Sequence, residues 1–322
     1  MIIIVTPVEP VSDSGNGVTA RRWAEILGAL GHHVTIAARY RGNEHPASAL
    51  VALHARKSAD SIRAFHADRP AAPIVVALTG TDVYPDLATT GVDPAVLATA
   101  TRLVVLQPDA MARLDPALRD RTRVITQSMP AIPRQPPRPD CFEVAFLAHL
   151  RSVKDPLRPA AAVRLLPGTS RIVVTHVGQA LDPAISAAAA EETRSNPRYN
   201  WLGPVPRTAA LDLMARSRLL LLTSWHEGGA NVVSEALAAR TPILASAIPG
   251  SIGLLGADYP GYFRPGDAAD LAAKLDAVEN DRGGIHQRLL EHCDAVRPLV
   301  EPNREQQAWA SMLTELELSV PV

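Results

Sequence analysis

The chain has 322 residues, a length that suits two domains of roughly 150 residues each. Its hydrophobic fraction of 47% and charged fraction of 20% are ordinary for a globular protein and exclude a disordered chain. The formal net charge of -1 excludes a strongly basic surface, so nucleic acid is not expected as a partner.

Cysteine content and hydropathy narrow the class further. Cys141 and Cys293 lie far apart and lack metal-ligand spacing, so we expect neither a disulfide framework nor a zinc site. The opening MIIIVTP has no basic n-region, and no apolar run is long enough to span a bilayer. We therefore expect a cytoplasmic protein without stable membrane insertion, and the sequence predicts no particular oligomeric state.

Short apolar runs alternate with helical patterns in the first part of the chain. The run 2–5 is wholly apolar, as in a parallel strand buried on both faces, and 18–30 carries one apolar helix face. Further strands are predicted at 34–37, 49–53, 74–78, 103–106 and 124–126. This alternation is typical of a doubly wound α/β domain.

Five prolines between Met129 and Pro139 favour an extended connector and mark a domain boundary. Beyond them the alternation resumes, with strands predicted at 144–147, 172–177, 199–202, 219–223 and 243–246. The sequence thus predicts an α/β protein with two Rossmann-like doubly wound domains, at 1–135 and 136–302. The remaining segment, 303–322, is predicted to be helical around 303–318 and is a candidate to pack back across the junction.

The stretch SWHEGGANVVSEALAARTP, 224–242, places Glu227 and Glu235 eight residues apart. It joins the apolar run 219–223 to a helical apolar face, so it forms a strand-to-helix turn at the carboxyl edge of the sheet. Open α/β sheets bind ligands at this edge, where a helix N-terminus offers free amides to phosphate.

The residue types in this turn suit a nucleotide sugar. Gly228 and Gly229 would let a diphosphate approach closely, and Asn231, Ser234 and Glu235 are expected opposite the apolar helix face. Glu235 could then accept hydrogen bonds from a ribose diol, and Glu227 could reach a sugar ring beyond the diphosphate. The alternative is a first-turn acid at Glu227, a helix cap at Asn231 and a solvated surface carboxylate at Glu235.

The stretch EGGANVVSEALAARTPILAS resembles the E-x7-E signature of family-4 glycosyltransferases. Three further segments resemble the family in the expected order: FLAHLRSVKDP, WLGPVPRTAALDLMARSRLLLLTS and PGYFRPGDAADLAAKL. The resemblance implies the GT-B architecture, in which two Rossmann-like domains face each other across a cleft.

The resemblance also implies donor-site roles. It assigns donor phosphate to Lys154, ribose to Glu235, the neighbourhood of the sugar to Glu227, and the base to backbone around Gly203 to Val205. For Lys154 a plain surface cation is the alternative.

The chain departs from the family pattern in three places. His149 stands where the family has an arginine, and Arg151 is a plausible replacement, so either residue could contact phosphate. Arg240 occupies the place of a helix-ending glycine. Thr79, in VVALTGTDVY, replaces a histidine that is common on the catalytic side.

A closer resemblance, over nearly the whole chain, is to the selenosugar synthases of selenoneine biosynthesis. It is carried by first-domain segments such as TPVEPVSDSGNGVTARRWAEILGALGHHV and LVALHARKSADSIRAF, together with GGANVVSEALAARTPILASAIPGSIGLLGADYPGYF. That resemblance implies transfer from UDP-N-acetylglucosamine to selenophosphate, with release of UDP and phosphate and without a cofactor. Selenophosphate is already anionic, so it needs hydrogen-bond donors and cations rather than a base.

The acceptor-side candidates are loop or strand-end residues of the first domain: Gly15, Asn16, Gly17, Arg21, Arg22, His54, Arg56, Thr79, Thr81 and Asp82. Of these, Asn16, His54 and Thr79 are candidates for a catalytic role beside Glu227. Each has a structural alternative, such as a turn at 15–17, an exposed helix face at Arg21 and Arg22, a core histidine at His54 or a turn cap at Asp82.

Three other functions remain open. A conventional family-4 enzyme with an alcohol acceptor would need a base, for which His54 is the evident candidate. A sugar-nucleotide epimerase and a non-catalytic sensor of UDP-sugars are the others. Because no DxD-type aspartate pair is present to hold a diphosphate-bridging metal, we expect no metal requirement.

Overall fold

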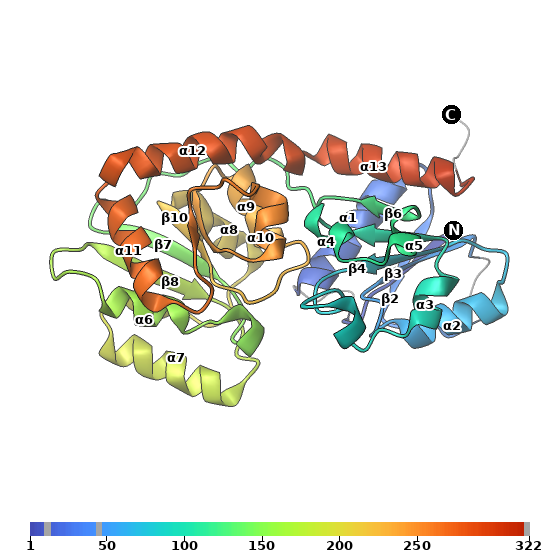
Figure 1. Cartoon of the computed structure of the whole chain (residues 1–322), viewed down its shortest axis with the longest axis horizontal. Helices are drawn as coiled ribbons and strands as arrows, with labels where there is room; N and C mark the ends of the chain where they lie inside the picture. The colour runs from blue at the N-terminus through green and yellow to red at the C-terminus, as the bar shows by residue number, and fades with distance from the viewer. Residues whose placement is uncertain (10–13, 43–46, 319–322) are drawn as a thin grey trace. The chain divides into compact units, whose positions relative to one another are not determined.

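The structure, a computed structural model, describes residues 1–9, 14–42 and 47–318. It contains two compact units. Figure 1 shows their helices and strands, coloured by residue number from the N-terminus to the C-terminus. Unit 1 comprises Met1–Ser128, Glu227–Asn231 and Pro302–Val322, and unit 2 comprises Met129–His226 and Val232–Glu301. The short segment Glu227–Asn231 therefore packs with unit 1, although unit 2 flanks it on both sides in the sequence.

Unit 1 contains a six-stranded parallel sheet in the order β2-β1-β3-β4-β5-β6. Its strands are β1 (Ile2–Val5), β2 (Val34–Ala37), β3 (Ala49–Leu53), β4 (Ile74–Leu78), β5 (Arg102–Val105) and β6 (Thr122–Val124). Its helices are α1 (Gly15–Ala29), α2 (Ala59–Asp68), the short 3-10 helix η1 (Leu87–Thr89), α3 (Pro94–Thr99), α4 (Asp109–Ala112), α5 (Pro116–Arg119) and α13 (Pro302–Glu315). The central strands are apolar along their whole length because helices cover both faces of the sheet.

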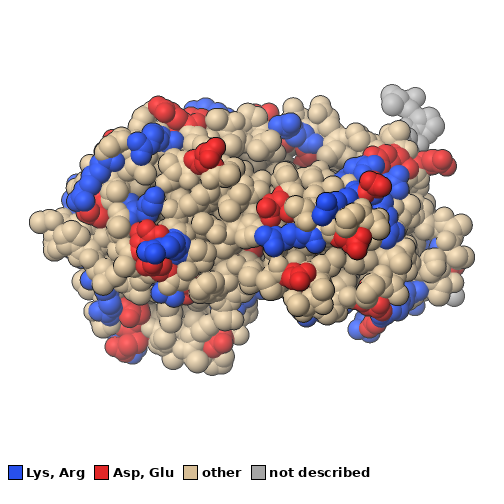
Figure 2. Space-filling model, in the orientation of Figure 1, with Lys and Arg blue, Asp and Glu red and all other residues tan. Residues whose placement is uncertain are grey.

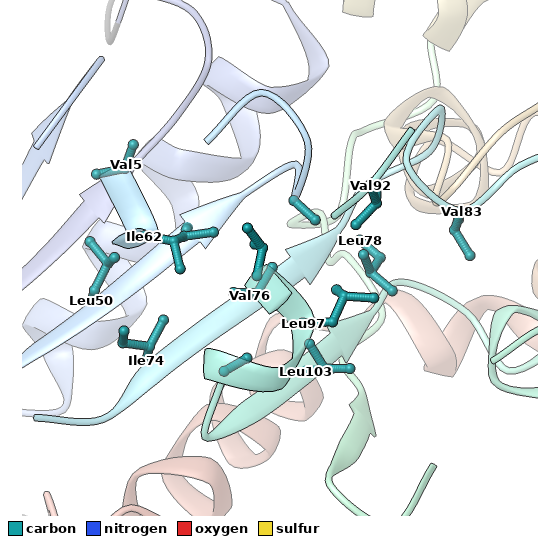
Figure 3. Packing of buried hydrophobic residues seen from close by; sticks show 14 of the residues in the cluster. Val5, Leu50, Ile62, Ile74, Val76, Leu78, Val83, Val92, Leu97 and Leu103 are labelled. Carbon is teal, nitrogen blue, oxygen red and sulfur yellow. The ribbon is translucent and has the colours of Figure 1, made fainter. Parts of the chain in front are cut away.

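Two apolar clusters fill the two faces of this sheet. On one face Leu50 and Val76 pack around Ile62 of α2, as Figure 3 shows. On the other face the strands pack against Trp23 of α1 and Trp309 of α13, whose rings meet edge to face with their centroids 4.8 Å apart. The C-terminal helix is therefore part of the core of unit 1.

Unit 2 contains a second six-stranded parallel sheet, in the order β12-β11-β10-β7-β8-β9. Its strands are β7 (Phe142–Leu147), β8 (Ile172–Val177), β9 (Tyr199–Trp201), β10 (Leu219–Leu222), β11 (Ile243–Ser246) and β12 (Tyr262–Phe263). Its helices are η2 (Ser152–Lys154), α6 (Arg158–Arg164), α7 (Pro183–Ser195), α8 (Arg207–Arg216), α9 (Asn231–Ala238), α10 (Pro249–Leu255), α11 (Ala268–Glu279), η3 (Arg282–Gly284), α12 (Ile285–Val296) and η4 (Arg297–Val300).

The structure confirms the α/β class and every strand predicted from an apolar run, with shifts at some ends. The last strand of the first sheet is Thr122–Val124 rather than 124–126. Helix α1 begins at Gly15 rather than 18, because the Ser14 side chain accepts a hydrogen bond from the Gly17 N–H and caps it. Residues 15–17 thus form the first turn of a helix. The alternative that they form only a loop turn is therefore wrong.

Surface charge and hydropathy agree with the composition. On the face drawn in Figure 2, acidic and basic side chains are interspersed, which fits the formal net charge of -1. Along the described ranges, no helix is both long and apolar enough to cross a membrane.

Helix α9 ends at a residue with left-handed backbone that is not glycine. Arg240 has φ +54°, its N–H donates to the Leu237 carbonyl at 3.1 Å, and the Thr241 N–H donates to the Ala236 carbonyl at 2.9 Å. These two bonds define a Schellman motif, which favours glycine because a Cβ strains this conformation.

We predict that Arg240→Gly raises the free energy of unfolding by about 0.5 to 1 kcal/mol, because it relieves that strain. Arg297→Gly is the matched control, since both arginines pair with Asp294 and Arg297 has right-handed φ -51°. Urea denaturation of both variants checks this. Destabilisation of Arg240→Gly by as much as Arg297→Gly would contradict it.

Candidate active site

The strand orders place one switch point in each sheet. In unit 2 the chain runs outward from β7 in both directions, through β8 and β9 on one side and β10 to β12 on the other. In unit 1 the order reverses between β1 and β3. Ligands of open α/β sheets bind at the carboxyl ends of strands beside such a point. Lys154 follows β7 and Glu227 follows β10 of the unit 2 sheet, and in unit 1 the first turn of α1 follows β1 and His54 follows β3.

In unit 2 the loops after β7 and β10 are bonded to each other. The Thr223 hydroxyl donates to the carbonyl oxygens of Lys154, at 2.8 Å, and Asp155, at 3.1 Å. The Trp225 N–H donates to the Val153 carbonyl at 2.9 Å. The backbone that carries Lys154 is therefore held against the end of β10.

His149 follows β7 and is half-buried. The Gln179 N–H donates to its Nδ1 at 3.1 Å, so the neutral ring carries its proton on Nε2. Burial, followed by the charges of Arg151 and Lys154, lowers the pKa of His149 below its ordinary value. At neutral pH this residue can donate a hydrogen bond to an anion, while the positive charge comes from Arg151 and Lys154.

Glu235 lies on α9 with only 6% of its surface exposed, so the alternative of a solvated surface carboxylate is wrong. Ser234, the preceding residue of α9, is buried as well. The Glu235 Oε1 lies 2.6 Å from Nη2 of Arg207, the first residue of α8. The ion pair orients the carboxylate.

Arg207 was not found from the sequence, because 28 positions separate it from Glu235 and no local spacing joins them.

The residues predicted to bind the base of the nucleotide precede helix α8, on which Arg207 lies. Gly203 has φ +76° and its carbonyl accepts from the Gly178 N–H at 3.0 Å, while Val205 is half-buried before α8.

The segment Glu227–Asn231 lies in unit 1, and its glycines are closely packed there. A Cβ on Gly228 would lie 2.3 Å from the Thr79 carbonyl oxygen, and a Cβ on Gly229 would lie 2.4 Å from Leu106 Cβ. From the sequence, both glycines were expected to let a diphosphate approach closely. The structure gives a second reason for glycine at these two positions. The chain of unit 1 itself occupies the space where side chains would be.

Asn231 connects this segment to α1. Its amide nitrogen donates to the Gly15 carbonyl at 3.2 Å, and its Oδ1 accepts from Arg22 Nη1 at 3.1 Å. Arg22 also pairs with Glu305 through Nε at 2.9 Å. Asn16 and Gly17 lie in the same first turn of α1.

His54 follows β3 and is buried, with left-handed φ +70°. Its Nε2 lies 3.0 Å from the Thr81 hydroxyl, and its Nδ1 lies 3.6 Å from Oδ2 of Asp82. Burial lowers the pKa of His54, and nearby Lys57 and Arg56 act in the same direction against Asp82. The imidazole is therefore neutral at neutral pH.

Asp82 organises the backbone around this histidine. Its buried carboxylate accepts hydrogen bonds from the N–H groups of Ala55, Thr79 and Gly80, at 2.8 to 2.9 Å. Asp82 therefore holds the ends of β3 and β4 together, and Thr79 is presented from β4 beside it.

The remaining candidates of unit 1 have mixed environments. Arg56 is exposed and donates to the Thr90 carbonyl at 2.9 Å, while Arg21 is half-buried on α1. Glu227 is also half-buried. Within the described residues, no group of three or more His, Cys, Asp or Glu side chains could hold a metal ion. That the enzyme needs no metal stays a prediction.

Comparison with known proteins gives the class. The family described as Glycosyl transferases group 1 matches residues 130–294, just over half of the 322-residue chain. The chain belongs to this family, and it is a glycosyltransferase. No curated protein matches the sequence significantly.

Solved structures resemble the whole chain. Sucrose-phosphate synthase from Thermosynechococcus elongatus has 15% identity over 99% of each chain, with a TM-score of 0.76. Anabaena HepE in complex with UDP and glucose has 14% identity over 98% of this chain and 99% of its own, with a TM-score of 0.77. A glycosyltransferase from Rickettsia africae has 15% identity over 99% of each chain, with a TM-score of 0.73. These likenesses confirm the GT-B fold.

We predict that Glu235→Gln raises the KM for the donor more than it lowers kcat, because a ribose contact acts alike in the ground and transition states.

Arg207→Ala should weaken UDP binding at least about tenfold, since it leaves Glu235 without its partner. Calorimetry with UDP and steady-state kinetics measure both effects.

Arg216→Gln is the control on the same helix, because Arg216 pairs with buried Glu143 at the opposite end of α8, at 2.8 Å. It should lower stability and leave UDP affinity unchanged. Equal losses of UDP affinity in the two arginine variants would remove Arg207 and Glu235 from the donor site.

Proposed function

We propose that this glycosyltransferase transfers N-acetylglucosamine from UDP-N-acetylglucosamine to selenophosphate. The selenium attacks the anomeric carbon, a carbon-selenium bond forms, and the carbon-oxygen bond to UDP breaks with its electron pair leaving on UDP. Hydrolysis of the selenium-phosphorus bond then releases phosphate and the seleno-sugar. The proposal combines the family membership with the closer resemblance of nearly the whole chain to selenosugar synthases.

The donor half of the proposal is supported by the loops of unit 2. His149, Arg151 and Lys154 supply donors and positive charge after β7, and Glu235 is a buried, oriented carboxylate suited to a diol. Among the structural relatives, HepE was solved with UDP-glucose, and a pneumococcal O-GlcNAc transferase with UDP and GlcNAc. These ligands support a UDP-sugar as donor.

The observation that carries the acceptor half is the chemistry at the ends of β3 and β4. Thr79 stands where the family commonly has histidine, and the nearby His54 is buried with Nε2 bonded to Thr81. Neither residue is an open, ready base. An acceptor that is already ionised needs none.

Buried polar atoms in unit 1 add support. Thr6 Oγ1 and Arg22 Nη2 have no hydrogen-bond partner among the described residues. Buried polar groups are normally bonded, so such atoms are candidates to bind a ligand. Thr6 directly follows β1 and was not singled out from the sequence.

A conventional O-glycosyltransferase is the second candidate, and one observation favours it. The lowered pKa of His54 keeps its imidazole neutral, the form that a general base requires, with Asp82 beside Nδ1. The two functions differ in whether the histidine takes a proton during the transfer.

We predict that UDP release from UDP-N-acetylglucosamine requires selenophosphate. The enzyme is incubated with the donor alone, with selenophosphate, and with inorganic phosphate as the matched anion lacking selenium, and UDP is measured by chromatography. Sugar epimerisation is followed by NMR in the same samples. Release of UDP without any acceptor, epimerisation, or binding without turnover would each defeat the proposal.

We also predict that His54→Gln keeps kcat within about tenfold of the wild type at saturating substrates, because loss of a general base costs about 10² to 10⁴ in rate. The exposed His66 supplies the control variant His66→Gln. A base must be neutral, so a base mechanism would show an acid limb at the lowered pKa of His54, below 6.5. A hundredfold fall in kcat, with loss of that limb from the pH profile, would establish the base mechanism instead.

A further inference from the structure

Glu305 of α13 is a buried carboxylate with several donors directed at it. Its side chain is 0% exposed. Its Oε2 accepts from Arg22 Nε at 2.9 Å, from the Ser128 N–H at 2.8 Å and from the Ser128 hydroxyl, while Oε1 accepts from Trp23 Nε1 at 2.7 Å. A carboxylate at this depth requires such partners, because an unpaired buried charge is very costly.

Arg22 carries this anchoring to Asn231. Its guanidinium is planar, so fixing Nε on Glu305 also fixes Nη1, which donates to Asn231 Oδ1 at 3.1 Å. The other end of the Asn231 amide donates to the Gly15 carbonyl at 3.2 Å. Asn231 is therefore held from both ends of its amide, and Glu305 holds one of those ends.

The cluster lies where the chain of unit 1 continues into unit 2. Ser128 is the last residue of the first segment of unit 1, Asn231 is the last residue of its second segment, and Glu305 is near the start of its third. The Glu305 carboxylate thus bonds directly to Ser128 and, through Arg22, holds Asn231. It therefore connects the ends of the first two segments of unit 1 to the beginning of the third.

We infer that Glu305 is a positioning residue for the binding of a nucleoside diphosphate. Asn231 is the first residue of α9, and the amides at that helix N-terminus are donors for phosphate. By fixing Arg22, Glu305 fixes Asn231 and the start of α9. This inference rests on the proposed function, because it requires the donor diphosphate to bind at α9.

The chain supplies two matched controls. Glu315, on the same helix, pairs with Arg102 and Arg123 at the partly exposed surface, and neither arginine bonds to Asn231 in the described part of the chain. Trp23 bonds to Glu305 within the same buried cluster, but it contributes no hydrogen bond to Arg22 or Asn231 in the described contacts. A loss of stability alone can therefore be separated from a loss of positioning.

The test is calorimetric titration with UDP, below the onset of unfolding of each variant. Glu305→Gln should raise the Kd for UDP about tenfold, because its amide cannot accept from Arg22 and Ser128 as the carboxylate does. Glu315→Gln should leave the Kd unchanged within about twofold, and Trp23→Phe should lower the thermal midpoint with the same small effect on Kd.

A double-mutant cycle tests the path itself. Asn231→Ala removes the end of the path without touching the buried carboxylate, and the double variant with Glu305→Gln should bind UDP no more weakly than Asn231→Ala alone. If Glu305→Gln does not fold, Arg22→Lys takes its place in the cycle, since one ammonium cannot reproduce both contacts of the guanidinium.

The outcomes separate the two levels of inference. Wild-type protein that fails to bind UDP would refute the donor proposal, and this inference with it. If the wild type binds UDP, then an unchanged Kd in Glu305→Gln, an equal loss in Trp23→Phe, or additive losses in the double variant would refute the positioning role alone.

Discussion

The parallel arrangement of both sheets is the constraint on which the rest of this molecule depends. Every strand pairing in the two sheets is parallel, so the carboxyl ends of the strands in each sheet meet at one edge. The strands are covered on both faces, so a polar side chain within them, such as Glu143 or His176, is buried and needs partners inside the protein. Polar side chains such as His54, His149 and Thr223 therefore gather directly after strands, where the switch points create space for a ligand.

The E-x7-E segment shows how two compact units share one sequence motif. Glu227 belongs to unit 1, and Glu235, eight residues later, belongs to unit 2. Between them, Gly228 and Gly229 pack so closely on Thr79 and Leu106 that side chains would overlap the chain. The glycines are thus required by packing within unit 1, whatever they contribute to ligand binding.

Arginine pairs with a buried carboxylate in several places of both units. Glu305 pairs with Arg22, Glu235 with Arg207 and Glu143 with Arg216, at 2.6 to 2.9 Å. The planar guanidinium can bond a carboxylate and still direct a second nitrogen elsewhere, which an ammonium does less well. In unit 1 this property links a C-terminal helix to the first residue of α9. The same contacts therefore neutralise the buried charges and fix the side chains of Arg22 and Glu235.

The sequence by itself determined the two α/β sheets, since apolar runs such as 34–37 and 172–177 reproduce their strands to the residue. It also indicated the strand-to-helix turn that contains Glu227 and Glu235, because local periodicity and the family signature are both written in adjacent residues. Strand β12, with two residues, was too short to show a period. The partners of the buried charges depended on the tertiary structure. Arg22 and Glu305 are 283 positions apart, and no local pattern records a contact made only when α13 packs on α1.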